Sequence, residues 1–212
     1  MAVTYPFDLL DGFPGWSTEF EPLMRQEHSR TAGGVTYVKD FGSPLWRASY
    51  VSRSLTPNDL DAWRARLDLM EGGLQQFRGR QLSRCYPIRY PRGSWPTSNG
   101  FNGVNAKINT INGNRKVVTV GGLGGGLVLL PGDLLKIRDN LHRVVAGGAA
   151  TGAGVLSGLE VRPHLWPDTV VNDPVSLDHP YCLMTIVSGS IRSSADAATG
   201  RGVISFDAIE SR

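Results

Sequence analysis

The 212-residue sequence has few of the features that mark disulfide-rich, membrane-spanning or disordered proteins. Its two cysteines, Cys85 and Cys182, provide no disulfide framework. We interpret both as small buried hydrophobic residues, with a single disulfide left open. No run of about 18 apolar residues occurs, so no membrane-spanning helix is expected. Residues 1–6 show no basic region followed by an apolar stretch, so no signal peptide is expected.

Motifs for catalysis and metal binding are also missing. The glycine run at 121–126 lacks the Lys-Ser/Thr ending of a phosphate-binding loop, and no G-x-S-x-G nucleophile elbow occurs. Asp133 follows Pro131-Gly132, where a turn residue is expected. The histidines lie far apart and form no HExxH motif: His28, His142, His164 and His179. We therefore predict no catalytic residue, cofactor or metal, and no enzyme. The alternative is a hydrolase whose carboxylates meet only in the fold.

What the sequence does contain is a globular composition with many turn residues. Hydrophobic residues make up 41% of the chain and charged residues 19%, which excludes a disordered protein. The 26 glycines and 13 prolines, together with one clear helix signal, predict a mainly β fold rich in loops. The length suits one domain, or one domain with a smaller insertion. The net charge of +3 is too small to argue for nucleic-acid binding by itself.

The single helix is predicted over about residues 56–71. Thr56 can cap its first turn, Pro57 suits the first helical position, and the diglycine at 72–73 ends it. Its apolar residues follow one helical stripe: Leu60, Trp63, Leu67, Met70 and Leu74. Leu69 points away from this stripe. It is either a single exposed leucine or part of a second packing surface, such as a contact with a neighbouring subunit.

Strands are expected on both sides of the helix. Segments 35–39 and 45–53 alternate in polarity around a turn, which predicts an antiparallel hairpin. Residues 75–88 predict a strand pair or one bent strand. Three further strands close the fold at 175–177, 181–187 and 203–209. The aromatic and proline-rich segment 1–32 either reaches a neighbouring molecule or covers the protein's own core.

The middle of the chain has a different character. Residues 102–166 contain short strands with turns every 8–12 residues, which predicts a small all-β insertion domain. Residues 1–101 and 167–212 would then form the main domain. The loop at 87–100 is rich in proline and glycine, and long irregular loops often contact partners. Aromatic side chains near arginines in this part of the chain indicate buried packing, a subunit contact or a sugar-binding platform.

The order of these elements resembles that of the distal tail proteins of long-tailed, siphophage-like bacteriophages. The resembling segments cover most of residues 45–210. They are Leu45-Trp46-Arg47-Ala48-Ser49-Tyr50, the helix from Leu55-Thr56-Pro57 to Glu71-Gly72-Gly73, Phe77-Arg78-Gly79, the stretch from Gly126-Leu127 through Leu130-Pro131-Gly132-Asp133-Leu134-Leu135, Glu160-Val161-Arg162-Pro163 and Phe206-Asp207-Ala208-Ile209-Glu210.

The resemblance implies a tail-tube-like β-sandwich with one flanking helix and a second β domain on its outside. It implies a virion protein, assembled in the host cytoplasm, of which six copies form a ring. The ring would connect the tail tube protein to the baseplate hub protein and leave a channel for DNA, with no membrane, cofactor or catalytic residue involved. The insertion is too small for a large carbohydrate-binding domain, so a connector is expected, with a carbohydrate-binding adhesin module as the alternative. The predicted subunit-interface residues are Leu69, Tyr90, Arg92, Trp95 and Trp166.

Overall fold

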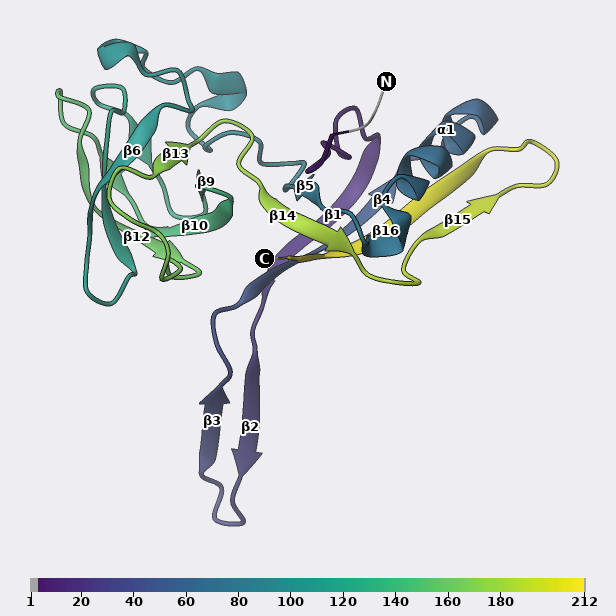
Figure 1. Cartoon of the computed structure of the whole chain (residues 1–212), viewed down its shortest axis with the longest axis horizontal. Helices are drawn as coiled ribbons and strands as arrows, with labels where there is room; N and C mark the ends of the chain where they lie inside the picture. Colours follow the sequence, from purple (N-terminus) through teal and green to yellow (C-terminus); the bar gives the residue numbers. More distant parts are fainter. Residues whose placement is uncertain (1–3, 212) are drawn as a thin grey trace.

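The computed structural model describes residues 4–211, and these residues form a mainly β protein with three visible parts (Figure 1). An antiparallel sheet carries the helix α1, a closed barrel lies beside it, and a two-stranded hairpin projects away from both. The sheet has the order β1 (Gly15–Leu23), β4 (Leu45–Ser52), β16 (Gly202–Glu210), β14 (Cys182–Ile186) and β5 (Phe77–Gly79), and β15 (Arg192–Ala195) also pairs with β16.

The predicted helix and its start at Thr56-Pro57 are confirmed, but the helix ends at Asp68, before the diglycine predicted to end it. Helix α1 spans Pro57–Asp68, and the Thr56 Oγ1 accepts a hydrogen bond of 3.3 Å from the Asp59 backbone N–H. The chain then passes through a short 3₁₀ turn, η1 (Glu71–Gly73), in which both glycines have positive φ. Leu74 was wrongly placed on the buried stripe. It follows this turn, so it leaves the helical face and is 81% exposed.

One face of the sheet forms the first hydrophobic core. Alternate residues of β16 are buried along its whole length, as expected for a strand with one covered face. The core contains Tyr50 and Phe206, whose rings pack against Phe13 of the N-terminal segment, and Trp46, whose ring packs against Phe20 and donates its N–H to the Leu141 carbonyl of the barrel at 2.8 Å. One sheet with a helix therefore builds this unit, and the described strands form no second sheet facing it. The N-terminal aromatic residues Phe13 and Phe20 cover the protein's own core.

The predicted hairpin between residues 35–39 and 45–53 is wrong, although both segments are strands. β3 (Thr36–Asp40) pairs with β2 (Gln26–Arg30), and β4 pairs with β1 and β16. The pairing partners lie further away in sequence because the chain reverses at residues 31–35. Strands β1, β2, β3 and β4 therefore form one long ribbon, in which the β1–β4 pair belongs to the sheet and the β2–β3 pair leaves it.

The barrel is closed by six antiparallel strands and encloses the second hydrophobic core. Its strand order is β10 (Asn140–Ala146), β12 (Leu156–Arg162), β7 (Val117–Gly121), β6 (Ala106–Ile111), β13 (Pro174–Ser176) and β9 (Leu134–Ile137). A short pair, β8 (Val128–Leu129) and β11 (Gly148–Ala149), lies beside it. Strand β13 falls after the 102–166 segment, and Figure 1 shows the chain running from it directly into β14 of the sheet.

The segment between the helix and the barrel is mostly irregular. Of residues 75–88, only β5 is a strand, so the expected strand pair is wrong. β5 pairs with β14 on one side and makes a parallel bridge from Phe77 to Phe7 on the other, which leaves no edge for a second strand. The following loop contains two 3₁₀ turns, η2 (Pro91–Gly93) and η3 (Ser98–Gly100). Cys182 is buried as predicted, whereas Cys85 is only half-buried, so the prediction that both are buried is wrong for Cys85. No helix within residues 4–211 is long and apolar enough to cross a membrane.

Candidate functional site

The most exposed organised part of the molecule is the projecting hairpin, which we call the arm (residues 24–44). Its strands β2 and β3 pair over five residues each, from Gln26 opposite Asp40 to Arg30 opposite Thr36. At the tip, the backbone N–H of Gly34 donates to the Thr31 carbonyl at 3.0 Å, and Gly34 has a φ of +83°. A glycine suits this position because side chains disfavour such a backbone conformation.

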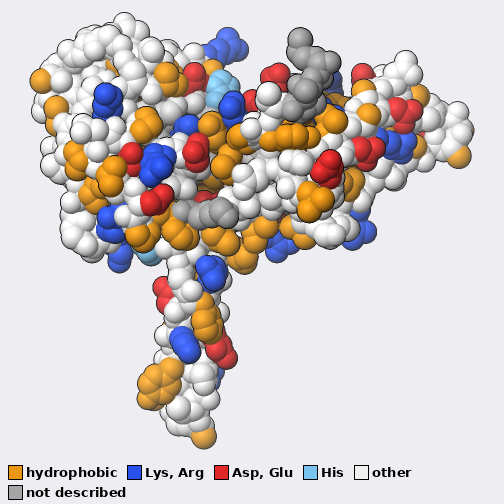
Figure 2. Space-filling model, in the orientation of Figure 1, with side chains coloured by type: hydrophobic (Ala, Val, Ile, Leu, Met, Phe, Trp, Pro, Cys, Tyr) orange, Lys and Arg blue, Asp and Glu red, His pale blue; other side chains and the backbone are white. Residues whose placement is uncertain are grey.

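Every residue of β2 and β3 is exposed, so the arm contributes to neither core. Five large apolar side chains on it are each more than half exposed: Met24, Val35, Tyr37, Val38 and Phe41. Figure 2 shows hydrophobic side chains alternating with charged ones along the arm. An isolated two-stranded hairpin is marginally stable in water, and grouped exposed apolar side chains are typical of interaction surfaces.

Charge pairing along the arm stays within the arm itself. Glu27 lies directly opposite Lys39 in the strand register, and the Lys39 Nζ lies 5.4 Å from the centre of the Phe41 ring. Opposite charges at facing positions stabilise a strand pair by up to about 1 kcal/mol. The backbone pairing keeps the two strands in register, and the apolar side chains of the arm stay exposed.

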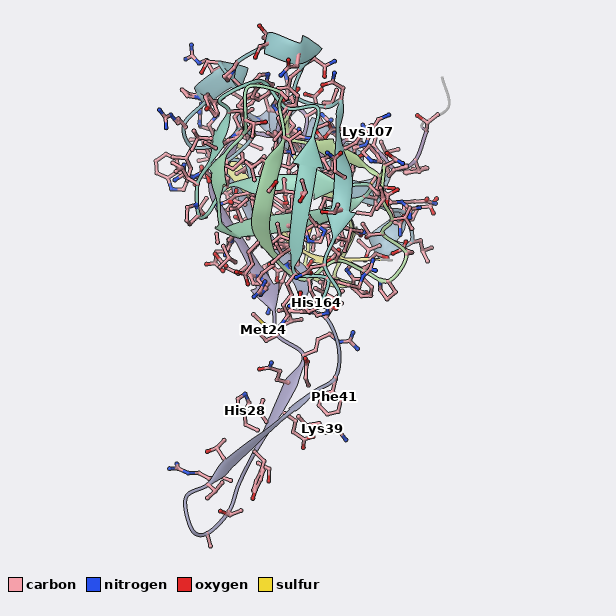
Figure 3. The ribbon with its side chains drawn as sticks, turned by 90° about the vertical axis from the view of Figure 1, so that its left-hand side faces the viewer. Met24, His28, Lys39, Phe41, Lys107 and His164 are labelled. Atoms are coloured by element: carbon pink, nitrogen blue, oxygen red, sulfur yellow. The ribbon has the colours of Figure 1, made fainter. Side chains whose placement is uncertain are left out.

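The root of the arm is fixed against the barrel. The Ser43 Oγ and the His164 Nε2 lie 2.8 Å apart, and the Phe41 backbone N–H donates to the Arg25 carbonyl at 2.8 Å. Arg143 of β10 donates to the Glu21 carboxylate at 3.0 Å and lies over the Trp46 ring. Figure 3 shows Met24 and Phe41 at this root, with His164 above them on the barrel side. The arm thus leaves the body from a fixed base.

A cavity of about 410 Å³ lies at this root, between the arm and the barrel. Its apolar part includes Trp46 and Met24, and its rim carries the cationic side chains of Lys116, Arg143 and Arg162. Within the described residues, no group of three or more His, Cys, Asp or Glu side chains is arranged to hold a metal ion.

Tyr50 and Cys85, which lie outside the arm, have altered proton affinities. Burial raises the pKa of the Tyr50 hydroxyl well above its usual range, and nearby Cys182 adds to the rise. Burial also raises the pKa of the Cys85 thiol, and Asp178 contributes to that rise. A thiol is nucleophilic only when deprotonated, so this shift works against a nucleophilic role for Cys85.

The five residues predicted as subunit contacts lie in separate places. Tyr90 and Trp95 are each 8% exposed and belong to the barrel core, where the Tyr90 hydroxyl accepts a hydrogen bond from the Val128 N–H at 2.8 Å. Arg92 is exposed on η2, and Leu69 is 36% exposed at the end of α1. Trp166 is half-buried and lines a shallow pocket near the β9–β10 turn.

The exposed apolar residues of the arm were not among those predicted contacts. Tyr37 and Val38 lie in the segment 35–39, which the sequence pattern assigns to an ordinary hairpin of the main domain, and Phe41 follows β3. The available signal was the Gly33-Gly34 pair, which lies midway between two segments of equal length and marks the real turn. No protein-family model matches this chain, and no curated protein matches it.

Proposed function

We propose that this chain is a structural virion protein similar to the distal tail proteins, with a tail-tube-like ring domain. Identical copies form a ring, six by the resemblance, between a tail tube protein and a baseplate hub protein, and DNA passes through its centre. The chain has no catalytic role in this proposal. The barrel is the outer β domain, and the arm reaches a neighbouring copy.

The arm is the observation that carries this proposal. Its apolar side chains, among them Tyr37, Val38 and Phe41, have no partner in the body of the protein, and its root holds it away from the sheet. A ring closes when each subunit makes the same head-to-tail contact with the next one. An extended hairpin that leaves one subunit and lies on the next supplies such a contact, and both its strand edges are available for pairing.

The uncovered face of the sheet is consistent with a DNA channel. A hollow of about 340 Å³ on this face is lined by three carboxylates, those of Glu19, Glu21 and Asp207, and by Arg47. Arg47 lies 3.8 Å from Asp207 and Arg143 lies 3.0 Å from Glu21, so Glu19 is the lining carboxylate that has no ion pair among the described residues. Carboxylates repel a phosphate backbone, so a ring lined by this face would let DNA pass without holding it.

The test is the mass of the full chain in solution, measured by light scattering after size exclusion. The wild-type protein is expected to assemble to a multiple of its 23.0 kDa chain mass. A double variant, Tyr37→Ser with Val38→Ser, is expected to run as a monomer, because a well-packed interface residue contributes about 2 kcal/mol or more to binding.

The matched control removes two equally exposed apolar side chains from the barrel, through Val145→Ser with Val170→Ser. This variant should assemble as the wild type does. A wild-type chain that stays monomeric over a wide range of concentration and salt contradicts the proposal. Equal assembly of the arm variant and the wild type contradicts the role of the arm.

A carbohydrate-binding module is the second candidate, and one pocket favours it. Trp166 lines a hollow of about 370 Å³ together with Arg138, Asp139, Asn140 and Asp168. An aromatic ring among carboxylate, amide and guanidinium groups is the usual make-up of a sugar site. Binding on a glycan array that Trp166→Ala abolishes would support this function, and an array without signal would exclude it.

A further inference from the structure

A second basic pocket, separate from the arm, lies where the sheet meets the barrel. It has a volume of about 230 Å³, and its walls come from β5, β9, β13 and the segment leading into β14. Arg78 comes from the middle of β5, Lys136 from β9, and Tyr181 from the residue just before β14. Side chains on strands from both units therefore face one small space, and their positions are set by two separate hydrogen-bonded sheets.

The charges around this pocket do not balance. The Arg80 Nη1 lies 2.9 Å from both carboxylate oxygens of Asp8, so these two charges offset each other. The Asp178 carboxylate contacts the Nδ1 of its neighbour His179. Three cations, those of Arg78, Arg80 and Lys136, therefore line the pocket with two carboxylates, and within residues 4–211 neither Arg78 nor Lys136 has a carboxylate within ion-pair distance.

The two uncompensated cations share one aromatic neighbour. The Lys136 Nζ lies 4.1 Å from the centre of the Tyr181 ring, and the Arg78 guanidinium carbon lies 5.3 Å from it. The Arg78 Nε is buried and has no hydrogen-bond acceptor among the described residues. Buried N–H groups are nearly always bonded, so this donor adds to the case for an external acceptor, although the Arg66 Nε outside the pocket lacks an acceptor in the same way. Two like charges held beside one ring also favour an anion.

The size of the pocket limits that anion. Pockets for organic ligands usually measure about 300–1,000 Å³, so a space of about 230 Å³ suits a small group better than a whole nucleotide. Arginine binds phosphate through its planar fork, and lysine adds a point charge. We propose that the pocket between β5, β9 and the start of β14 binds a small tetrahedral oxyanion of the phosphate class through Arg78 and Lys136. The bound anion would link the sheet to the barrel.

The experiment is isothermal titration of the full wild-type chain with inorganic phosphate at low ionic strength. Saturable binding of one phosphate per chain is expected, with at least a tenfold weaker affinity in Lys136→Gln and in Arg78→Gln. Phenyl phosphate, titrated in parallel, distinguishes the source: tighter binding than phosphate indicates a phosphomonoester, and weaker binding indicates the free ion. Both results support the site.

The matched control is Lys39→Gln, which removes the same charge from the arm and should bind phosphate as the wild type does. Lys136 is half-buried and has no ion pair within residues 4–211, so its variant tests the site even if Arg78→Gln fails to fold. No saturation by about 10 mM phosphate overturns the proposal, because that corresponds to less than about 3 kcal/mol of binding. Equal binding by Lys136→Gln and the wild type overturns it as well. Neither result bears on the assembly of the ring.

Discussion

The closed barrel and the arm are both antiparallel β structures, yet they are stabilised in opposite ways. In the barrel, every strand has two neighbours, and one side of each long strand is buried, as in β7 and β12. In the arm, each strand has one neighbour, and both faces of β2 and β3 are in water. The barrel therefore has a core of its own, whereas the arm has only cross-strand contacts and a fixed root.

This difference teaches that regular hydrogen bonding does not show where the stability of a protein lies. A backbone hydrogen bond contributes only about 1 kcal/mol net, because water satisfies the same groups in the unfolded chain. Apolar burial supplies most of the driving force, and the arm has almost none. A segment that is ordered but contributes little to folding is available for binding, since its apolar atoms are still in contact with water.

The largest expected effect separates the two regions directly. Leu135 of β9 is fully buried in the barrel core, so Leu135→Ala should lower the free energy of unfolding by about 2–5 kcal/mol. Tyr37→Ala in the arm, where the side chain is 63% exposed, should change it by no more than about 0.5 kcal/mol. Urea unfolding at a protein concentration at which both variants are monomeric measures the difference. Similar losses of unfolding free energy in Leu135→Ala and Tyr37→Ala would contradict the difference between the barrel and the arm.

A medium effect is expected where the barrel holds a loop by hydrogen bonds. Asp133, which the sequence assigned to a turn, is 2% exposed, and its two oxygens accept from the Ile88 N–H at 2.6 Å and the Leu130 N–H at 2.8 Å. Asp133→Ala should cost about 1–3 kcal/mol, because it leaves buried donors unsatisfied. Asp133→Asn should cost less, since its amide oxygen still accepts one bond.

The control is Asp139→Ala at the exposed β9–β10 turn, which should stay within about 0.5 kcal/mol of the wild type. Thermal unfolding of the three variants ranks them. If Asp133→Ala and Asp139→Ala have equal stability, the buried hydrogen bonds of Asp133 contribute nothing and the barrel is stabilised by apolar burial alone.

Local signals in the sequence predicted the local structure well. The cap at Thr56 acts through bonds of neighbouring residues, so the start of the helix was predictable, whereas the glycines at 72–73 lie in the following 3₁₀ turn and do not mark the end of α1 at Asp68. The pairing of β4 was not predictable, because it depends on which distant strand lies beside β4 in the fold. Periodicity alone cannot distinguish β1 and β16 from the nearer β3 as partners.

The predicted subunit contacts include no residue of the arm, for a similar reason. Trp95 and Tyr90 stand among prolines, a setting that indicates an irregular loop, but the loop folds back and places both rings in the barrel core. Tyr37 and Val38 alternate with polar residues like those of any half-buried strand. Whether a strand face is covered depends on the tertiary fold, so exposure of the arm could be seen only in the structure.

A smaller effect should sharpen the comparison at the tip of the arm. Gly34 has a φ of +83°, which costs an L-residue about 1 kcal/mol or more, and no atom lies within 4 Å of an added Cβ. Gly34→Ala should therefore loosen the arm through backbone strain alone. We expect faster hydrogen exchange of the β2 and β3 amides with an unchanged melting temperature of the body.

The adjacent glycine provides the control for this prediction. Gly33 has no positive φ, and an added Cβ would meet only the Thr31 Oγ1 at 3.9 Å, so Gly33→Ala should leave exchange unchanged. A drop in the melting temperature of the body in Gly34→Ala would mean that the arm and the body unfold together, and that the arm is not the independent element described above.

The smallest expected effect concerns the other exposed ribbon, formed by β15 and β16. At its turn, the Asp196 carboxylate accepts from the Thr199 N–H at 2.7 Å, the Thr199 hydroxyl at 2.8 Å and the Ala198 N–H at 3.1 Å. The bond from the Thr199 backbone is the main cause of a lowered Asp196 pKa. A carboxylate with a lowered pKa stabilises the turn above its unfolded pKa, and this contribution is lost as the pH falls through the folded value.

Carboxyl NMR titration should therefore place Asp196 below the ordinary aspartate value of 3.8, with Thr199 amide exchange rising over the same acidic range. Titration of Asp196 at or above that value would mean that its hydrogen bonds do not stabilise the turn. The β15–β16 ribbon would then resemble the arm, in which neither strand face is stabilised by burial.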